Sequence, residues 1–403
     1  MKKKEKREKK EKIVAKKNGR TLAKIKVVGV GGGGGNAVTR MKEDFLKGVE
    51  FIAVNTDVQD LDYCNAHKKI YIGKTVTKGL GAGMNPDLGR QAAEENRAEI
   101  ADALRGADLV FITCGMGGGT GSVGISVVAE IAREVGALTV AVVTKPFTFE
   151  GGQRMKIATD ALVKLKDKVD SFIVVPNDRI FVVIQKETSI TKAFEAIDDV
   201  LRNAVRGIAE LITMPGIINI DFSDVKAVMQ NAGSSVVGIG IASGKDRAIS
   251  AVNQAINSPL LESTIDGAKG VLFGVSGGRD LKMSEINDIA KVIADSIDSS
   301  AKIIFGAYHD RKLKKGQIKV TLIATSFNGS ALMRKPDLTS VTNLFGEKVS
   351  VSDKSEPKLA FANNIKEVKE VKESVVSDKD KEDSKKKSSD IWDIPAFLRK
   401  KKK

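Results

Sequence analysis

The chain has 403 residues, enough for two domains with tails, and its 42% hydrophobic content can form a sizeable core. Its formal net charge of +15 would favour a nucleic-acid or membrane partner if it were spread over the fold. However, residues 1–20 carry eleven Lys or Arg against three Glu, a net +8, and residues 399–403 add +5. The body is therefore close to neutral, which excludes a basic groove for nucleic acid.

The few cysteines and histidines narrow the protein class further. Cys64 and Cys114 are too few for a disulfide framework, and each is predicted to be a small buried residue in a reducing compartment. The two histidines, His67 and His309, exclude a His-rich zinc site. The charged N-terminal residues are not followed by the apolar segment of a signal peptide, and no apolar run in the sequence is long enough to cross a membrane. We therefore expect a cytoplasmic protein.

The first part of the chain alternates strands with helices. Residues 1–22 are predicted to be a disordered basic arm, because so dense a charge run cannot build a core. Strands are expected at 24–30, 49–55, 107–114, 138–147 and 171–177, and helices at 36–46, 87–104, 126–135 and 154–167. Near-continuous Val and Ile runs between amphipathic helices predict an α/β domain, residues 23–190, with a parallel sheet covered on both faces.

A long helix is expected to join this domain to a smaller one. Apolar residues recur every three or four positions from Thr191 to Thr213, and Pro215-Gly216 ends the pattern. Residues 191–224 therefore form the connection. A C-terminal α+β domain is predicted at 225–335, with strands at 234–243, 270–277, 301–309 and 317–327 and helices at 246–256 and 284–297.

The C-terminal region is predicted to be a disordered linker, residues 336–389, followed by a peptide, residues 390–403. Residues 349–389 hold ten Lys and nine acidic residues, too polar a composition to fold. The stretch "DIWDIPAFLRK" that follows contains the only tryptophan. Its apolar residues could form one face of a short helix in a partner's groove, although a terminal patch without function is the alternative; they are Ile391, Ile394, Phe397 and Leu398.

The first glycine cluster, "VVGVGGGGGNAV", follows a strand and opens a helix. Gly29, Gly31 and Gly34 satisfy the G-x-G-x-x-G pattern, and Asp57 ends the next strand, where a ribose-binding acid would lie. Taken alone this favours an NAD-binding oxidoreductase of the Rossmann type. The match is weak, because five consecutive glycines satisfy several templates at once.

A second cluster, "GMGGGTG" at 115–121, also lies between a strand and a helix. It offers a row of backbone N–H groups at a helix N-terminus, which can hold phosphate oxygens. Two such turns at neighbouring strand ends suit a mononucleotide polyphosphate better than a dinucleotide. A third glycine-rich loop, residues 78–89, could close over the terminal phosphate.

These segments carry a family resemblance. "GMGGGTGS" resembles the tubulin-type GTPase signature, and the segments "GVGGGGGNAV", "FIAVNTD", "TKGLGAG", "VVTKPFTFEGGQRM" and "AELITMPGIINIDFSDV" resemble the bacterial FtsZ family. The matches run in order over about residues 25–345, and "DIPAFLRK" resembles that family's C-terminal peptide. The resemblance implies a GTPase that binds GTP or GDP with Mg²⁺ and polymerises with itself, head to tail, in the mid-cell division ring.

The resemblance also implies a set of nucleotide-binding residues. The phosphates would be held by Gly32, Gly33, Gly34, Gly35 and Asn36 and by Gly118, Gly119, Thr120 and Gly121, with Ala82 and Gly83 near the γ-phosphate. Glu150 would bind the ribose and Arg154 would lie near the phosphates. Asn177 and Asp198 would bind the base beneath a stacking Phe194.

The chemistry of Asp198 supports its implied role independently. A carboxylate accepts hydrogen bonds from the N1–H and N2–H₂ groups of guanine, whereas adenine has an acceptor at N1. Asp198 should therefore select GTP over ATP. The alternative, from helical periodicity alone, is a solvated acidic residue on the long helix.

Asp221 and Asp224 lie three apart at an expected helix start, so their spacing alone favours an N-cap and a first-turn acid. The resemblance implies instead that this loop, with Asn219, enters the nucleotide site of the next subunit and that its carboxylates position or polarise the attacking water. A site shared in this way propagates as an open filament. A Rossmann oxidoreductase and a non-hydrolysing filament scaffold of the same fold stay open as alternatives.

The remaining expectations concern partners and one unusual residue. By resemblance, membrane-tethering division proteins bind Asp390–Lys400. The Lys-rich ends either add weak attraction to anionic lipid or are solvated without a partner. Val123 and Ser126 stand where the family has Gly and Pro. Since Val tolerates a helical backbone and not a positive φ, we expect Val123 in the first turn of a helix.

Overall fold

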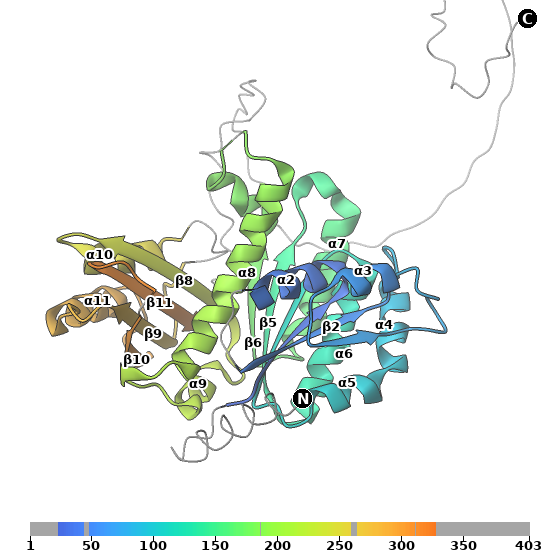
Figure 1. Ribbon diagram of the computed structural model, residues 1–403, viewed down its shortest axis with the longest axis horizontal. Coiled ribbons are helices and arrows are strands. Elements are labelled where there is room, and N and C mark those ends of the chain that lie inside the picture. Colours follow the sequence, from blue (N-terminus) through green and yellow to red (C-terminus); the bar gives the residue numbers. More distant parts are fainter. Residues whose placement is uncertain (1–22, 44–47, 186, 259–263, 311, 328–403) are drawn as a thin grey trace, which may run out of the picture. The chain divides into compact units, whose positions relative to one another are not determined.

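The computed structural model describes residues 23–43, 48–185, 187–258, 264–310 and 312–327. The predicted basic arm, the linker and the terminal peptide lie outside the described residues. The described residues all belong to one compact unit, in which two groups of strands flank the long helix α8, Ile190–Thr213 (Figure 1). This arrangement confirms the predicted α/β class with a largely parallel sheet.

The first group of strands is parallel and has the order β3-β2-β1-β4-β5-β6. Its members are β1 Ile25–Val30, β2 Val49–Asn55, β3 Lys68–Tyr71, β4 Leu109–Gly115, β5 Leu138–Lys145 and β6 Ser171–Pro176. Alternate residues of each strand enter opposite cores: Val27 packs on one face and Val28 on the other. Both faces are therefore buried, which explains the continuous apolar runs.

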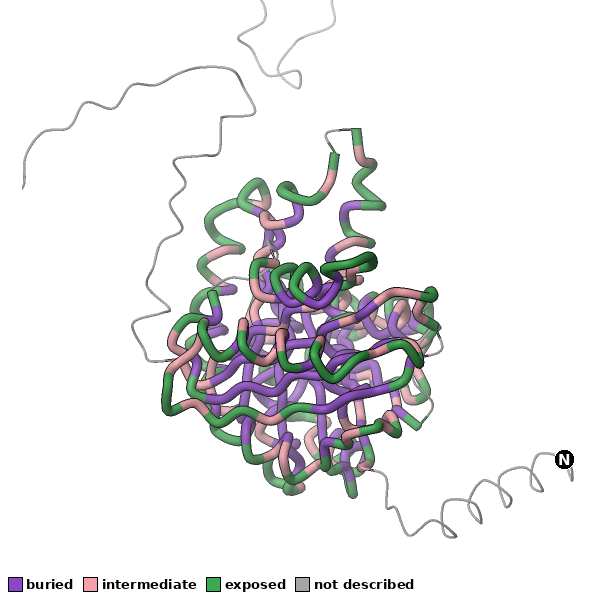
Figure 2. The backbone as a smooth tube through the Cα atoms, turned by 90° about the vertical axis from the view of Figure 1, so that its left-hand side faces the viewer, coloured by how far each residue is buried: buried purple, intermediate pink, exposed green. Residues whose placement is uncertain are grey.

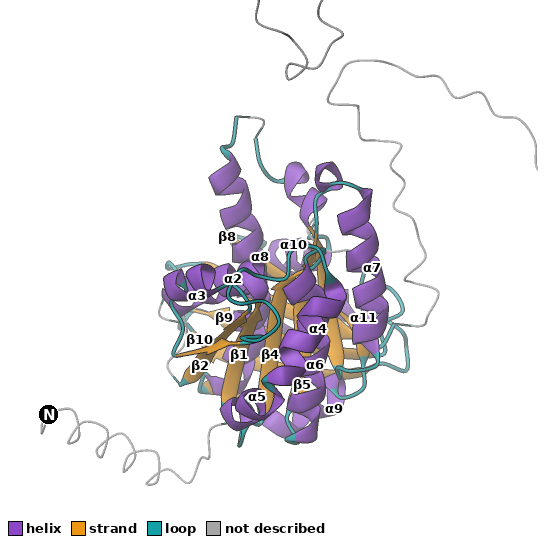
Figure 3. Ribbon diagram, turned by 90° about the vertical axis from the view of Figure 1, so that its right-hand side faces the viewer, coloured by secondary structure: helices purple, strands orange, loops and turns teal. Residues whose placement is uncertain are grey.

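Helices cover both faces of this sheet (Figure 3). One face carries α4 Pro86–Glu95, α5 Arg97–Leu104, α6 Gly119–Glu134 and α7 Gly152–Lys166, and the other carries α2 Gly31–Glu43, α3 Val58–Tyr63 and α8. Buried residues concentrate along the strands and the inner sides of the helices (Figure 2). The single helix expected at 87–104 is wrong, because Asn96 breaks it with φ −108° and ψ 21° and accepts from the Gly73 N–H.

The central helix α8 begins one residue before its expected start. The Ser189 hydroxyl accepts from the Lys192 N–H at 3.4 Å, which caps the helix. The helix ends at Thr213, before Met214 takes an extended conformation ahead of Pro215. One side of α8 packs on the first group of strands, and Leu211 packs beside Tyr308 of the second group.

The second group of strands is mixed, with the order β8-β11-β9-β10-β7. Its elements are β7 Gly216–Ile218, α9 Phe222–Met229, β8 Gly233–Ser243, α10 Arg247–Ile256, β9 Gly270–Gly277, α11 Met283–Asp295, β10 Lys302–His309 and β11 Gln317–Thr325. Strand β11 is antiparallel to both its neighbours. A short parallel pairing of Ser171 with Gly233 joins β6 to β8, so the two groups form one continuous sheet.

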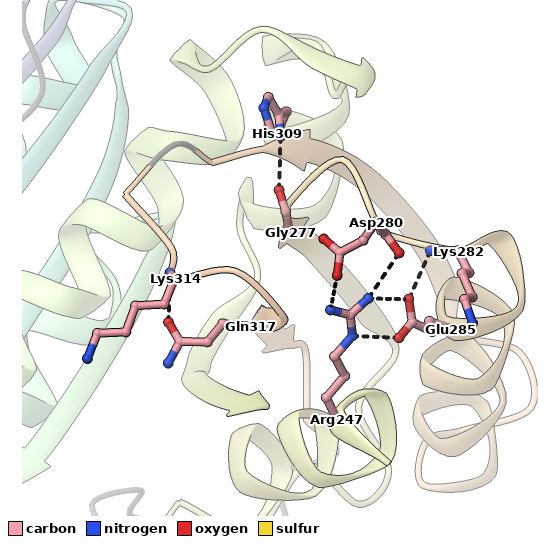
Figure 4. Close-up of polar contacts among 8 residues, drawn as sticks. All are labelled: Arg247, Gly277, Asp280, Lys282, Glu285, His309, Lys314 and Gln317. Carbon is pink, nitrogen blue, oxygen red and sulfur yellow. Dashed lines mark hydrogen bonds and ion pairs between the residues drawn. The ribbon is translucent and has the colours of Figure 1, made fainter. Parts of the chain in front are cut away.

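Arg247 fastens α10 to the start of α11 (Figure 4). This buried guanidinium donates from Nε to Glu285 Oε1 at 2.6 Å, from Nη1 to Asp280 Oδ2 at 2.6 Å and from Nη2 to Glu285 Oε2 at 3.0 Å. The hydrogen bonds from Arg247 lower the pKa of Glu285. Since every donor group of Arg247 is bonded, the cluster is structural.

No helix in the described part of the chain combines the length and the apolar character that crossing a bilayer requires.

Candidate functional site

A pocket of about 490 Å³ opens where the carboxyl ends of β1, β2, β4 and β5 meet. Strand β1 lies between β2 and β4, and the connections that follow β1 and β4 pass to opposite faces of the sheet. Ligands of open α/β sheets bind at such a switch point. The volume also suits a small-molecule ligand.

Most predicted nucleotide-binding residues line this pocket. They come from the ends of different strands and from the loops that follow: Gly32, Gly33, Ala82, Gly83, Gly118, Gly119, Thr120, Gly121, Glu150, Arg154, Asn177 and Phe194. Three segments far apart in sequence, the two glycine clusters and the 78–89 loop, therefore meet around one cavity.

Two helices begin at the pocket wall. Helix α6 starts after Gly118, which caps it without a side-chain hydrogen bond, and α2 starts at Gly31 with φ +70°. Both N-termini direct partial positive charge and backbone N–H groups toward the cavity. This is the geometry that anions require.

Glycine is needed where the loops touch. A Cβ on Gly119 would lie 2.6 Å from the Asn85 oxygen and 2.8 Å from the Gly83 oxygen. The Gly119 N–H donates to Gly83 O at 2.7 Å, so this N–H joins the two loops. Next to it, the hydroxyls of Thr56 and Thr120 are 2.6 Å apart and buried. The loops thus form one hydrogen-bonded floor.

Glu150 and Arg154 form a pair at the pocket edge. Arg154 Nη1 donates to Glu150 Oε2 at 2.5 Å, and the Phe147 N–H donates to Glu150 Oε1 at 2.9 Å. Both carboxylate oxygens are therefore engaged. A ribose hydroxyl would join Glu150 as an additional donor.

Aromatic and amide groups form the other end of the pocket. Phe194 is 42% exposed and packs edge-on against Phe147, with ring centroids 5.6 Å apart. The Asn177 Oδ1 atom is buried, and among the described residues no donor lies within hydrogen-bonding distance of it. A flat ring with donor groups would satisfy both features.

The charged residues of the lining do not favour an anion by themselves. The described lining contains the carboxylates of Asp57, Asp60 and Glu150 against the guanidinium of Arg154. A polyphosphate would therefore depend on backbone N–H groups and on an added cation.

Four residues of the predicted binding set lie elsewhere. Gly35 and Asn36 line a small adjoining hollow. Gly34 faces the strands, since its Cβ would lie 2.5 Å from Thr113 O. Asp198, mostly buried on α8, is paired with Arg40 of α2 at 3.2 Å and does not line the pocket.

Asn219, Asp221 and Asp224 also lie away from the pocket. Asp221 caps α9, where its Oδ1 accepts from the Asp224 N–H at 2.8 Å and its own N–H donates to Asp224 Oδ2 at 3.5 Å. The capping geometry predicted from spacing is therefore present. Asn219 Oδ1 accepts from the Gly216 N–H at 2.8 Å, which closes the preceding turn.

Helix α6 includes Val123, whose φ is not positive. The predicted helical backbone is confirmed, but Val123 is the fifth residue and lies just past the first turn. The helix starts earlier than expected, because Gly119 and Gly121 already have helical conformations. Ser126 is also helical and buried.

The two cysteines, Cys64 and Cys114, are buried as predicted.

Several lining residues were not predicted as binding residues. Asn55 ends β2, Thr56 follows it and Asp60 lies in α3. Thr144 is near the end of β5, and Pro146 follows that strand. A signal was present for four of the five, which lie at the carboxyl ends of strands, whereas Asp60 lies in a helix. Among the described residues, no group of three or more His, Cys, Asp or Glu could hold a metal ion.

Comparisons with known proteins agree with this geometry. Residues 24–185 match the Tubulin/FtsZ family GTPase domain, and residues 233–328 match the C-terminal domain of the FtsZ family. The chain is similar to an empty FtsZ dimer from M. jannaschii, with 46% sequence identity, a TM-score of 0.72, and coverage of 78% of this chain and 92% of that one. A GDP-bound CetZ1 monomer from Haloferax volcanii has the same fold at 22% identity, with a TM-score of 0.66 and coverage of 76% and 95%.

The fold, the two glycine loops and the GTPase-domain match define a tubulin-like GTPase that binds guanine nucleotides. The chain belongs to the FtsZ family.

Proposed function

We propose that this chain polymerises head to tail into filaments and that GTP is hydrolysed at the interface between successive subunits. One observation carries the proposal: the pocket and the acidic residues Asp221 and Asp224 belong to opposite ends of α8. Phe194 is the fifth residue of this helix, and Thr213 is its last. At 1.5 Å per residue they are about 28 Å apart along the axis. Figure 1 shows α9 beside the far end of α8.

This separation means that a chain cannot bring its own Asp221 to its own nucleotide. The acidic loop of one copy can reach the pocket of the next copy. Such a contact joins two different surfaces and repeats without closing, so it generates a filament. The M. jannaschii relative is described as a dimer, which supports self-association.

Exposed apolar residues support a contact at both ends of the molecule. Phe149 and Phe181 are exposed beside Phe147 near the pocket, with ring centroids 4.7 Å and 5.5 Å from it. At the other end, Ile217 is 73% exposed two residues before Asn219. Apolar side chains at opposite ends suit a head-to-tail contact, which would remove both from water.

The chemistry of the shared site requires positioning rather than covalent catalysis. Phosphoryl transfer needs an oriented water and charge stabilisation at the phosphate. The helix N-termini and glycine loops would hold the phosphates, and the incoming Asp224 carboxylate would orient or polarise the water. Asn219 and Asp221 would fix the loop that presents it, through the cap and turn bonds described above.

Base selection would rest on Asn177 and Asp198. The unpaired Oδ1 of Asn177 can accept from a purine amino group. An ionised Asp198 accepts from guanine N1–H and N2–H₂, which adenine cannot satisfy. Phe194 supplies the stacking surface, and Glu150 the ribose contact.

Mg²⁺ fits the oxygen donors that are present. It prefers oxygen ligands and keeps several waters, so the nucleotide phosphates with one or two protein oxygens suffice. The pocket offers the Thr56 and Thr120 hydroxyls and the Asp57 carboxylate. Bound Mg²⁺ would neutralise charge on the phosphates, which the acidic lining leaves uncompensated.

The cellular role is part of the same proposal. The filaments would belong to the division ring at mid-cell, and residues 390–400 would bind membrane-tethering division proteins. Hydrolysis would weaken the subunit contact and so couple nucleotide state to filament length. Light scattering with GTP tests this: polymers that form and then disappear support it, and polymers that persist favour a non-hydrolysing scaffold.

A mixing experiment tests the shared site directly. Asp224→Asn removes the acidic group but keeps the pocket, and Asp198→Asn removes the proposed contact with the base but keeps the acidic loop. Each variant alone should have little GTPase activity. In a one-to-one mixture about a quarter of the interfaces join an intact pocket to an intact loop, so activity should reappear. A mixture as inactive as its components would contradict the shared site.

A further inference from the structure

Arg40 and Asp198 form an ion pair between two helices that bound the nucleotide region. Arg40 lies on α2 and Asp198 on α8, and Arg40 Nε is 3.2 Å from Asp198 Oδ2. Arg40 lies four positions after Asn36, which lines the adjoining hollow, and Asp198 lies four positions after Phe194, which lines the pocket. The Arg40–Asp198 pair therefore lies one helical turn from Phe194, the residue proposed to stack on the base.

The Asp198 carboxylate lies in surroundings that disfavour its charge. Burial raises its pKa, Arg40 lowers it, and the neighbouring Asp199 and Glu195 raise it, so that together these effects place the pKa at about 6. Asp199 is itself paired with Arg202 at 2.8 Å. Of the groups that act on Asp198, Arg40 is the one that favours ionisation. Because only the ionised carboxylate accepts both guanine N–H groups, Arg40 supports the form that selects guanine.

The bonding of Arg40 differs from that of a structural arginine. Its Nη1 atom is buried, and the described part of the chain places no acceptor within hydrogen-bonding distance. In contrast, all three nitrogens of Arg247 donate to neighbours (Figure 4). A buried N–H without a partner is unfavourable for stability. Arg40 therefore keeps one donor group that the contact between α2 and α8 does not use.

We propose that Arg40 is a positioning residue for guanine selection, which acts through its ion pair to keep the Asp198 carboxylate charged and directed at the base. The proposal rests on the proposed function, because it requires that Asp198 reads the base of bound nucleotide. It adds a residue of α2 to the specificity apparatus. It also predicts that guanine selection depends on pH.

The test measures GDP and ADP affinity of the full chain by calorimetry from pH 5.5 to 8.5. Wild-type GDP affinity should be constant above about pH 7 and fall below about pH 6, as Asp198 is protonated. In Arg40→Gln the fall should move up by about one pH unit, which weakens GDP binding about twofold at pH 7 and about eightfold at pH 5.5 and lets it recover at pH 8.5. Arg40→Lys should restore most of the wild-type profile, and ADP affinity should not change.

A matched control is Arg202→Gln, which removes the partner of Asp199 one turn along the same helix and should keep the wild-type profile. Equal GDP and ADP affinity in the wild type overturns both the base-reading function and the role of Arg40. GDP preference in the wild type with an unchanged profile in Arg40→Gln overturns the role of Arg40 alone. If Arg40→Gln does not fold, the pH profile of Asp198→Asn tests the proposal instead. A GDP affinity that still falls at low pH in Asp198→Asn overturns the proposal.

Discussion

Replacing Gly119 by alanine perturbs the point where the α6 loop meets the loop that precedes α4. The new Cβ would lie 2.6 Å from the Asn85 oxygen, 2.8 Å from the Gly83 oxygen and 2.9 Å from the Ala82 oxygen. Ordinary contact begins near 3.4 Å, so the Asn85 carbonyl must retreat by about 0.8 Å. All three atoms belong to backbone, which cannot rotate away as a side chain can.

The expected cost has two parts. Overpacking of this kind costs about 1–3 kcal/mol. The bond from the Gly119 N–H to Gly83 O, now 2.7 Å, would lengthen and forfeit about 0.5–1.5 kcal/mol. The free energy of unfolding should therefore fall by about 2–4 kcal/mol in urea unfolding of nucleotide-free protein. GDP affinity should weaken at least tenfold, because Ala82 and Gly83 withdraw from the pocket.

Gly152→Ala is the matched control. Gly152 is the first residue of α7, and its Cβ would meet nothing within 4 Å. Its unfolding free energy should be unchanged or rise by less than about 1 kcal/mol, since alanine restricts the unfolded chain. A Gly119→Ala protein with the wild-type urea midpoint and GDP affinity would refute the close packing of the two loops.

Two further predictions concern the core and the Arg247 cluster. Arg247 lowers the pKa of Glu285 in the folded state, so the stabilisation from this ion pair is present above the unfolded value of 4.5 and is lost as pH falls through the lower folded value. Glu285→Gln should lower the free energy of unfolding at pH 7 by about 1.5–3 kcal/mol and make it less dependent on pH in the acid range. An unchanged dependence in urea titrations from pH 3 to 7 would count against this. Burial raises the pKa of Cys114, so a thiol reagent should label it only upon unfolding, and labelling of native protein at the unfolded rate would contradict the buried position.

The sequence predicts long buried elements well and short edge elements poorly. The strand expected at 270–277 has those bounds, because a continuous apolar run at full burial has few alternatives. Strands β3 and β7, with four and three residues, were not predicted. They are defined by hydrogen bonds to β2 and β10, which are distant in sequence and leave no periodic pattern.

The glycine motifs predicted where the pocket lies, but they could not show which glycines line it and which pack against the strands. Gly33 and Gly34 are adjacent, yet Gly33 lines the pocket and Gly34 packs against the strands, because neighbouring residues point about 100° apart on a helix. The pairing of Asp198 with Arg40 was also beyond the sequence. The two residues are 158 positions apart, and only the packing of α2 on α8 brings them together.

The contacts between α8 and the second group of strands determine whether this helix could slide and bring the acidic loop of a subunit to its own pocket. Both oxygens of the buried Glu210 are bonded, Oε1 to Arg206 Nε at 2.7 Å and Oε2 to Lys319 Nζ of β11 at 2.6 Å. Nearby, the Tyr308 hydroxyl donates to Leu211 O at 2.9 Å. Sliding α8 against the second group of strands would leave a charge unpaired in the interior, which is strongly unfavourable. The helix therefore keeps the pocket and the acidic loop at a fixed separation, as the proposed shared site requires.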